Sequence, residues 1–107
     1  MNQSLRLTAA EQLGGARFAV TFSNGRSGNA DLTPLLTGPM FNTLLDPERL
    51  RRFELDPELG TITWPNGADL APEAIYFQAF RNDPALQDTF QRWGYLESPT
   101  APLGNQR

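Results

Sequence analysis

Apolar and polar residues alternate in the first third of the chain, which is the pattern of half-buried β-strands. The clearest alternation puts three apolar side chains on one face, namely Phe18, Val20 and Phe22. Leu5 and Leu7 indicate a short strand earlier in the chain, before a break at Gly14 and Gly15. The start of the chain is therefore predicted to form part of a β-sheet with one buried face.

The loop after the clearer strand is predicted from the register of its apolar residues. An Asn-Gly pair that ends at Gly25 is a strong hairpin signal, and a two-residue loop would set polar side chains opposite the buried row. A three-residue loop pairs Val20 with Gly28 instead. The same register pairs Phe18 with Ala30. The pattern therefore predicts the three-residue loop, with Gly25 in the left-handed conformation.

The middle of the chain changes to helical spacing. Gly38 and Pro39 can start a short helix that carries four apolar residues on one side, namely Met40, Phe41, Leu44 and Leu45. Asp46 followed by Pro47 is an N-cap with proline at the first helical position, which predicts a further turn or two through Leu50.

A second hairpin is predicted after these helices, because the apolar period returns to two at Phe53. Residues 56–60 place proline and glycine where a type I turn favours them. With a four-residue loop, Leu55 faces Ile62. Phe53 then faces Trp64, so both hairpins give consistent apolar rows.

Two helices are predicted for the remaining chain. Pro72 opens the first, with four apolar residues on one face, namely Ile75, Tyr76, Ala79 and Phe80. Asp83 and Pro84 begin the second, over about residues 84–93, and Gly94 is its expected stop. Its apolar stripe consists of Leu86, Phe90 and Trp93. Residues 98–107 are rich in Pro, Gly, Thr, Asn and Gln and are expected to form a flexible tail.

These elements predict an α+β fold with a small, antiparallel, hairpin-rich sheet of about five strands. Short helices and the C-terminal amphipathic helix pack against this sheet. The chain of 107 residues has room for one hydrophobic core. We therefore expect a single domain over residues 1–97, which includes the C-terminal helix over about residues 84–93.

The composition excludes the commonest catalytic chemistries. The chain has no histidine and no cysteine, and all nine basic residues are arginines, so the usual general base, thiolate and amine nucleophile are missing. We expect no enzyme, no cofactor and no metal site. An enzyme that works through carboxylates alone would need acids such as Asp56, Glu58, Asp69 and Glu73 to converge. No calcium-loop spacing accompanies these acids, so this alternative is not favoured.

Hydropathy and charge bear on partners and location. No apolar run is long enough to span a membrane, and the first residues lack a signal layout, so a cytoplasmic location is expected. The net charge of −3 argues against general nucleic-acid binding. The one basic cluster consists of Arg49, Arg51 and Arg52. It could meet phosphate or an acidic partner, but neighbouring acids favour a solvated, ion-paired surface.

The order of motifs resembles a known family. It includes Phe22-Ser23-Asn24-Gly25, Asp31-Leu32-Thr33-Pro34, Phe53-Glu54-Leu55-Asp56 and, most specifically, Trp64-Pro65-Asn66-Gly67-Ala68-Asp69-Leu70. Over residues 5–80 the chain resembles domain of unknown function 2442. The resemblance implies a small bacterial α+β domain, often encoded beside domain of unknown function 4160 in a pairing like that of a toxin and an antitoxin. Some members carry an added helix-turn-helix domain, for which residues 81–97 are too short.

The residues singled out for function also have structural explanations. In the Trp64–Leu70 run, a core tryptophan, a turn and a carboxylate of Asp69 bonded to amides near the next helix explain the residues without a binding role. Asp31 is similarly expected to form a turn. The 84–93 helix is open between packing on its own sheet and docking a partner or a second copy.

Three functions follow as hypotheses. The first is a non-catalytic protein-interaction module, in its finer form the antitoxin-like neutralising partner of a small toxin-like protein. Its expected contacts are Leu86, Phe90, Trp93, Tyr95, Arg49, Arg51 and Arg52. The second is a nucleic-acid-binding regulator or accessory, against which the negative charge counts. The third is the carboxylate-only enzyme.

Overall fold

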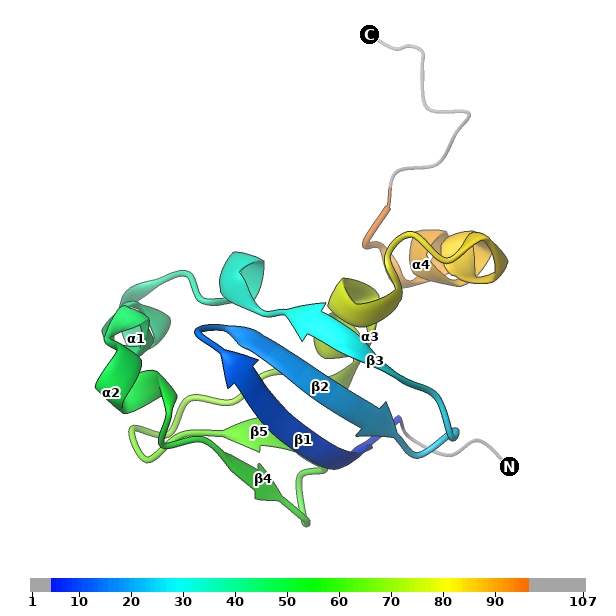
Figure 1. Ribbon diagram of the computed structural model, residues 1–107. Helices are drawn as coiled ribbons and strands as arrows, with labels where there is room; N and C mark the ends of the chain where they lie inside the picture. Colours follow the sequence, from blue (N-terminus) through cyan, green and yellow to red (C-terminus); the bar gives the residue numbers. More distant parts are fainter. Residues whose placement is uncertain (1–4, 97–107) are drawn as a thin grey trace, which may run out of the picture.

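The computed structural model describes residues 5–96, which form an α+β fold with five antiparallel strands (Figure 1). The predicted fold class is confirmed, and the strands divide into two sheets. The first sheet has the order β1 (Leu7–Gly14), β2 (Arg17–Phe22) and β3 (Ser27–Asp31). The second pairs β4 (Glu54–Asp56) with β5 (Thr61–Thr63). The predicted tail over residues 98–107 lies outside the described residues.

The β2–β3 hairpin has the predicted register. Val20 pairs with Gly28 and Phe18 with Ala30. The loop ends at Gly25, whose φ of 88° is the left-handed conformation that a residue without a Cβ adopts readily. The sequence prediction for this hairpin is confirmed, whereas β1 runs beyond the predicted short strand and continues to Gly14.

The second hairpin also has the predicted register, and hydrogen bonds join it to the first sheet. Leu55 pairs with Ile62. The amide of Leu7, at the start of β1, donates to the carbonyl of Gly60 at 2.8 Å. Gly60 has a φ of 68°, and a Cβ on it would lie 2.9 Å from the side chain of Arg6. A glycine is therefore required where the two sheets meet.

Short helical turns connect the sheets at one end of the molecule. They are α1 (Pro39–Asn42), the 3₁₀ turn η2 (Thr43–Leu45) and α2 (Pro47–Leu50). Leu44 is buried, but Met40 and Leu45 are 51% and 58% exposed. The prediction that all four apolar residues of this segment share a packed side is therefore wrong. The α-helix ends after one turn, and the change to a 3₁₀ turn rotates the following residues out of line.

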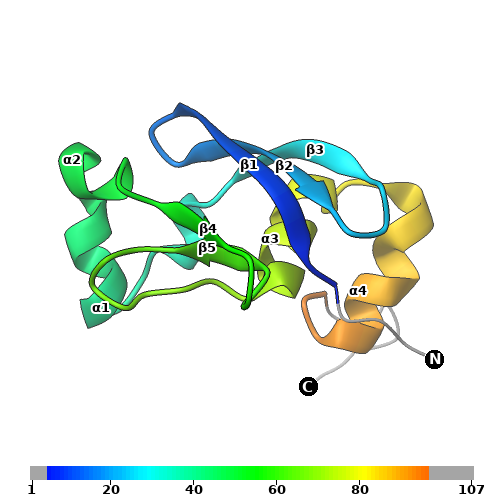
Figure 2. The same ribbon diagram turned by 90° about the horizontal axis from the view of Figure 1, so that it is seen from below.

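The other end of the molecule carries α4 (Gln87–Trp93), which follows the 3₁₀ turn η3 (Pro84–Leu86). Helix α3 (Pro72–Phe80) lies between the two ends (Figure 2). Its buried residues are Ile75, Tyr76 and Phe77. A Cβ at Gly28 would lie 2.9 Å from the ring of Phe80, so the glycine in β3 lets α3 approach the sheet closely. No helix among residues 5–96 has the length and apolar character needed to cross a membrane.

Helix α4 packs on its own domain, which answers the question that the sequence left open. Phe90 is fully buried, and its ring meets that of Phe77 edge to face at 5.0 Å. The amide of Tyr95 donates to the carbonyl of Phe90, and Gly94 has a φ of 88°, so a Schellman turn ends the helix as predicted. Phe90 cannot contact a partner and is removed from the expected binding residues.

Candidate functional site: an arginine-lined pocket

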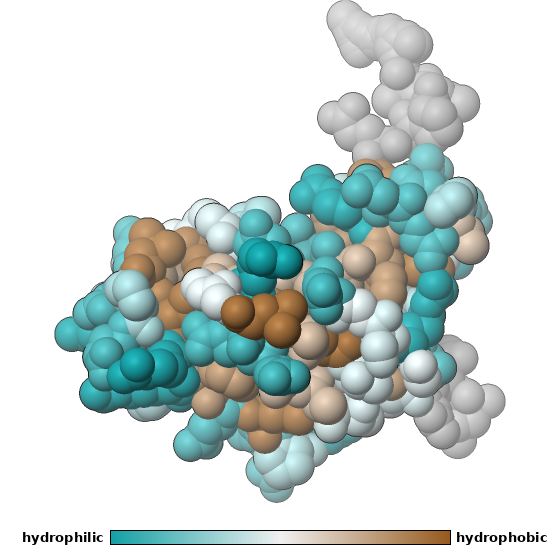
Figure 3. Space-filling view, viewed as in Figure 1, coloured by the Kyte–Doolittle hydropathy of each residue, from teal (hydrophilic) through white to brown (hydrophobic). Residues whose placement is uncertain are grey.

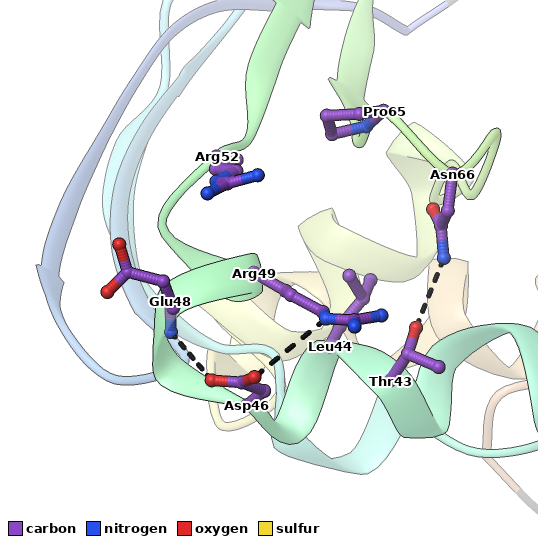
Figure 4. A pocket seen from close by; sticks show the side chains of 8 residues that line it. All are labelled: Thr43, Leu44, Asp46, Glu48, Arg49, Arg52, Pro65 and Asn66. Atoms are coloured by element: carbon purple, nitrogen blue, oxygen red, sulfur yellow. Dashed lines mark hydrogen bonds and ion pairs between the residues drawn. The ribbon is translucent and has the colours of Figure 1, made fainter.

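A pocket of about 310 Å³ lies between α2 and the turn after β5 (Figure 4). Its lining residues are Thr43, Leu44, Asp46, Glu48, Arg49, Arg52, Pro65 and Asn66. We call it the arginine pocket. It brings together two features that are well separated in sequence, the basic cluster and the Trp-Pro-Asn-Gly run.

The first wall of the arginine pocket is α2, whose start is capped as predicted. The Asp46 carboxylate accepts a hydrogen bond from the amide of Glu48 at 3.0 Å, and Pro47 occupies the first helical position. This cap fixes the beginning of a helix of four residues. It thereby sets the direction in which Arg49 leaves the helix.

The three arginines of the basic cluster have different surroundings. Arg51 is paired with Glu48 and does not line the pocket. Arg49 lies 3.8 Å from Asp46, measured from Nε to Oδ2. Arg52 forms no ion pair with any residue in the 5–96 range. The expectation of an ion-paired surface is confirmed for Arg49 and Arg51 and is wrong for Arg52.

The second wall is the Pro65–Gly67 turn, which is tied to α1. The Asn66 side-chain amide donates to the carbonyl of Met40 at 3.0 Å and to Oγ1 of Thr43 at 3.3 Å. Its carbonyl oxygen accepts from the amide of Ala68. Asn66 therefore does more than form the expected turn, since it joins the turn to a helix that lies 26 positions earlier in the chain.

Trp64 anchors the same turn from beneath. It is 4% exposed, and its indole N–H donates to the carbonyl of Leu50 at 3.0 Å. The structural explanation of Trp64 is confirmed. That of Asp69 is wrong, because Asp69 is exposed and α3 begins without a side-chain cap. The chain instead enters α3 through Pro72, which lies at the start of the helix.

Exposed apolar side chains lie beside the arginine pocket. Met40 supplies the carbonyl that Asn66 binds. Leu45 is the residue between Leu44 and Asp46 in the sequence, and both of these line the pocket. Figure 3 shows apolar and polar surface side by side over α1 and α2. The apolar pattern did not indicate that these two side chains lie on the surface. Four apolar residues within six positions are more than one helical turn can bury. This excess is the sequence signal that could have indicated exposed apolar residues here.

A second hollow of about 350 Å³ is lined in part by α4, at the other end of the molecule. Its lining includes Tyr76, Leu86 and Trp93. Leu86 is half-buried, whereas Trp93 and Tyr95 are 41% and 37% exposed. The Tyr95 ring stacks on Phe77 at 5.1 Å, and burial followed by the charge of Glu73 raises the pKa of its phenol. The predicted binding residues therefore lie on two separate surfaces, and those of α4 already pack largely within the domain.

Among the acidic residues that were considered for catalysis, Asp56 has a structural contact. The Asp56 carboxylate accepts hydrogen bonds from the amides of Glu58 and Leu59 in the β4–β5 turn. Within residues 5–96, no three His, Cys, Asp or Glu side chains are grouped so as to hold a metal ion.

Asp31 forms the expected turn, and its charge is expected to contribute to stability. The hydroxyl of Thr33, the amide of Thr33 and the nearby Arg17 hold the pKa of Asp31 below its ordinary value of 3.8. A lowered pKa in the folded state stabilises the protein above 3.8, and this contribution is lost as the pH falls through the lowered value. The stability advantage of the wild type over Asp31→Asn should therefore shrink below that pH in urea titrations. An unchanged difference would contradict this role.

Comparison with known proteins shows a family and a similar solved structure. The sequence model of the family described as "Protein of unknown function (DUF2442)" matches residues 8–81. A search of curated proteins gave no match. Among solved structures, the chain is similar to a protein of Nitrosomonas europaea described as a "Putative DNA Binding Protein", with a TM-score of 0.65 and 23% identity. The similarity covers 90% of this chain and 66% of that protein, just under two thirds of its length. At this identity it shows the fold alone.

Proposed function

The chain belongs to the DUF2442 family of unknown function, and from this premise we propose that it is a non-catalytic protein-interaction module that binds its partner over α1, α2 and the arginine pocket. The observation that carries the proposal is the pairing of exposed apolar side chains with arginines. Met40 and Leu45 are more exposed than the aromatic residues near α4. Methionine, arginine and a central apolar contact surrounded by polar groups are typical of protein interfaces.

The finer form of this proposal is an antitoxin-like role, in which the chain neutralises a small toxin-like protein encoded nearby. Support for this form comes from the gene pairing that the family resemblance implies. Neutralisation would require only that the chain cover a surface of its partner, so the absence of histidine and cysteine is no obstacle.

Co-purification with the product of the neighbouring gene tests the proposal. The wild type should form a stoichiometric complex. Leu45→Glu should weaken it by at least about tenfold, because a charge would replace an apolar contact that becomes buried when the complex forms. Leu59→Glu is the matched control, since Leu59 is 53% exposed but lies in the β4–β5 turn. Calorimetric titration gives both affinities. Equal losses in the two variants, or two separate species without a complex, would contradict the proposal.

Nucleic-acid binding is the second candidate. It is supported by the description of the structural neighbour and by the two arginines that line the pocket. The net charge of −3 and the presence of Asp46 and Glu48 in the same lining count against it. Binding of DNA or RNA at physiological ionic strength, with an affinity that falls steeply as salt is raised, would establish this candidate.

A further inference from the structure

We propose that the arginine pocket binds a carboxylate group on an acidic segment of the protein partner, and that an apolar side chain of the same segment packs on Met40 or Leu45. This inference rests on the proposed function and specifies the chemistry of the partner. It assigns Arg49 and Arg52 the role of carboxylate ligands.

The two arginines of the pocket have hydrogen-bonding capacity left. Each guanidinium carries five N–H donors in a planar fork that matches a carboxylate. Arg49 approaches Asp46 at 3.8 Å, measured from Nε to Oδ2, and Arg52 has no ion-pair partner among residues 5–96. The side chain of Arg49 is 61% exposed in this pairing, so an incoming ligand can reach it.

The acidic residues of the lining do not occupy these free guanidinium donors. The Asp46 carboxylate already accepts from the amide of Glu48. The Glu48 carboxylate is paired with Arg51, and in Figure 4 it points away from the opening between Arg52 and Pro65. The side of the pocket that faces this opening therefore presents the guanidinium groups.

The dimensions and apolar parts of the pocket suit an acidic side chain. A volume of about 310 Å³ accommodates a small group rather than a large ligand. Leu44, which is 2% exposed, and Pro65 contribute apolar lining. When a carboxylate binds there, this apolar lining shields part of the contact from water, which strengthens charge-assisted hydrogen bonds.

An acidic protein segment fits this surface better than nucleic acid does. A phosphate backbone would bring a row of charges past Asp46 and Glu48, on a chain with a net charge of −3. A protein segment can bring a single carboxylate to the arginines and place apolar groups on Met40 and Leu45, which are 51% and 58% exposed. Charge complementarity and apolar surface together favour the protein segment.

A short synthetic peptide of alternating glutamate and leucine is the first probe, and the same peptide with glutamine in place of glutamate is its control. Fluorescence anisotropy should show binding of the acidic peptide and at least about tenfold weaker binding of the glutamine peptide. Equal binding of the two peptides, or no binding of either, would overturn the inference. Competition by a single-stranded oligonucleotide stronger than that by the unlabelled acidic peptide would also overturn it, in favour of nucleic acid.

Charge-reversal variants locate the contact. Arg52→Glu should weaken binding of the acidic peptide by at least about tenfold, whereas Arg92→Glu should change it by no more than about twofold. Arg92 is the matched control because its side chain is 63% exposed, the charge change is the same and it lies on α4, outside the lining. Arg52→Lys should give an intermediate loss, since it keeps the charge but not the planar fork. Equal losses in Arg92→Glu and Arg52→Glu would show a general charge effect and overturn the assignment.

The same variants separate this inference from the proposed function. If the neighbouring gene product binds Arg52→Glu as well as the wild type but binds Leu45→Glu poorly, the interaction surface stands and the carboxylate assignment fails. If it binds both variants as well as the wild type, both proposals fail. Circular dichroism of each variant excludes loss of folding as the cause.

Discussion

Replacing Trp64 with alanine is expected to lower the free energy of unfolding by about 3–5 kcal/mol, the usual cost of removing a large buried aromatic side chain. Trp64 is 4% exposed, and its indole N–H bonds to the carbonyl of Leu50, the last residue of α2. The variant leaves a cavity and an unpaired buried carbonyl. Because domains of this size are stable by only about 5–15 kcal/mol, the loss is a large part of the total. Urea unfolding followed by circular dichroism measures it.

Trp64→Phe separates packing from hydrogen bonding in this contact. It keeps an aromatic ring but loses the indole donor, so we expect a smaller loss of about 1–3 kcal/mol. Both Trp64 variants should also weaken partner binding, since the indole holds α2 beside the turn that completes the arginine pocket. A loss below about 1 kcal/mol in Trp64→Ala would contradict its role as the anchor of the pocket.

Replacing Phe90 with alanine is expected to lower the free energy of unfolding by a similar amount, about 3–5 kcal/mol. The ring is fully buried and contacts Phe77 at 5.0 Å and Tyr76 at 6.1 Å between ring centroids. Phe90 is the buried residue that holds α4 to α3, and Trp93 adds a ring contact with Tyr76 at 5.9 Å. The variant should therefore unfold at a lower urea concentration. The backbone amides of α4 should also lose their protection from hydrogen exchange.

Trp93→Ala is the comparison for Phe90→Ala, because Trp93 lies on the same helix and is 41% exposed. It should cost less stability than Phe90→Ala, since less of the side chain leaves water on folding. If Phe90→Ala leaves stability unchanged but abolishes partner binding, α4 would be a docking helix rather than part of the domain. That outcome would reverse the assignment made from its burial.

Local patterns predicted the hairpins and caps correctly because short-range rules determine them. The register of β2 and β3 follows from the alternation of apolar residues, since a shift by one residue would turn every buried side chain to solvent. The caps at Asp46 and Asp83 follow from hydrogen bonds that span only two residues. The family resemblance, which depends on these same motifs, is confirmed by the match over residues 8–81.

The apolar pattern did not predict which apolar residues remain exposed. Met40 and Leu45 fit a buried helical face in sequence, but one turn of α-helix followed by a 3₁₀ turn cannot bury them together with Leu44. Phe90 shows the opposite case. It fits a docking stripe as well as a core position, and only the presence of α3 beside it shows that it is core.

The sequence by itself determined the α+β class, the two hairpins with their registers, the helix starts and the absence of histidine and cysteine chemistry. Only the tertiary structure decided that the strands form two sheets, that α4 packs on α3 and that Arg52 faces the Pro65–Asn66 turn. The physical reason is the range of the interactions. The arginine pocket depends on hydrogen bonds between Asn66 and Met40 and between Trp64 and Leu50, and neither pair is close enough in sequence to leave a periodic pattern.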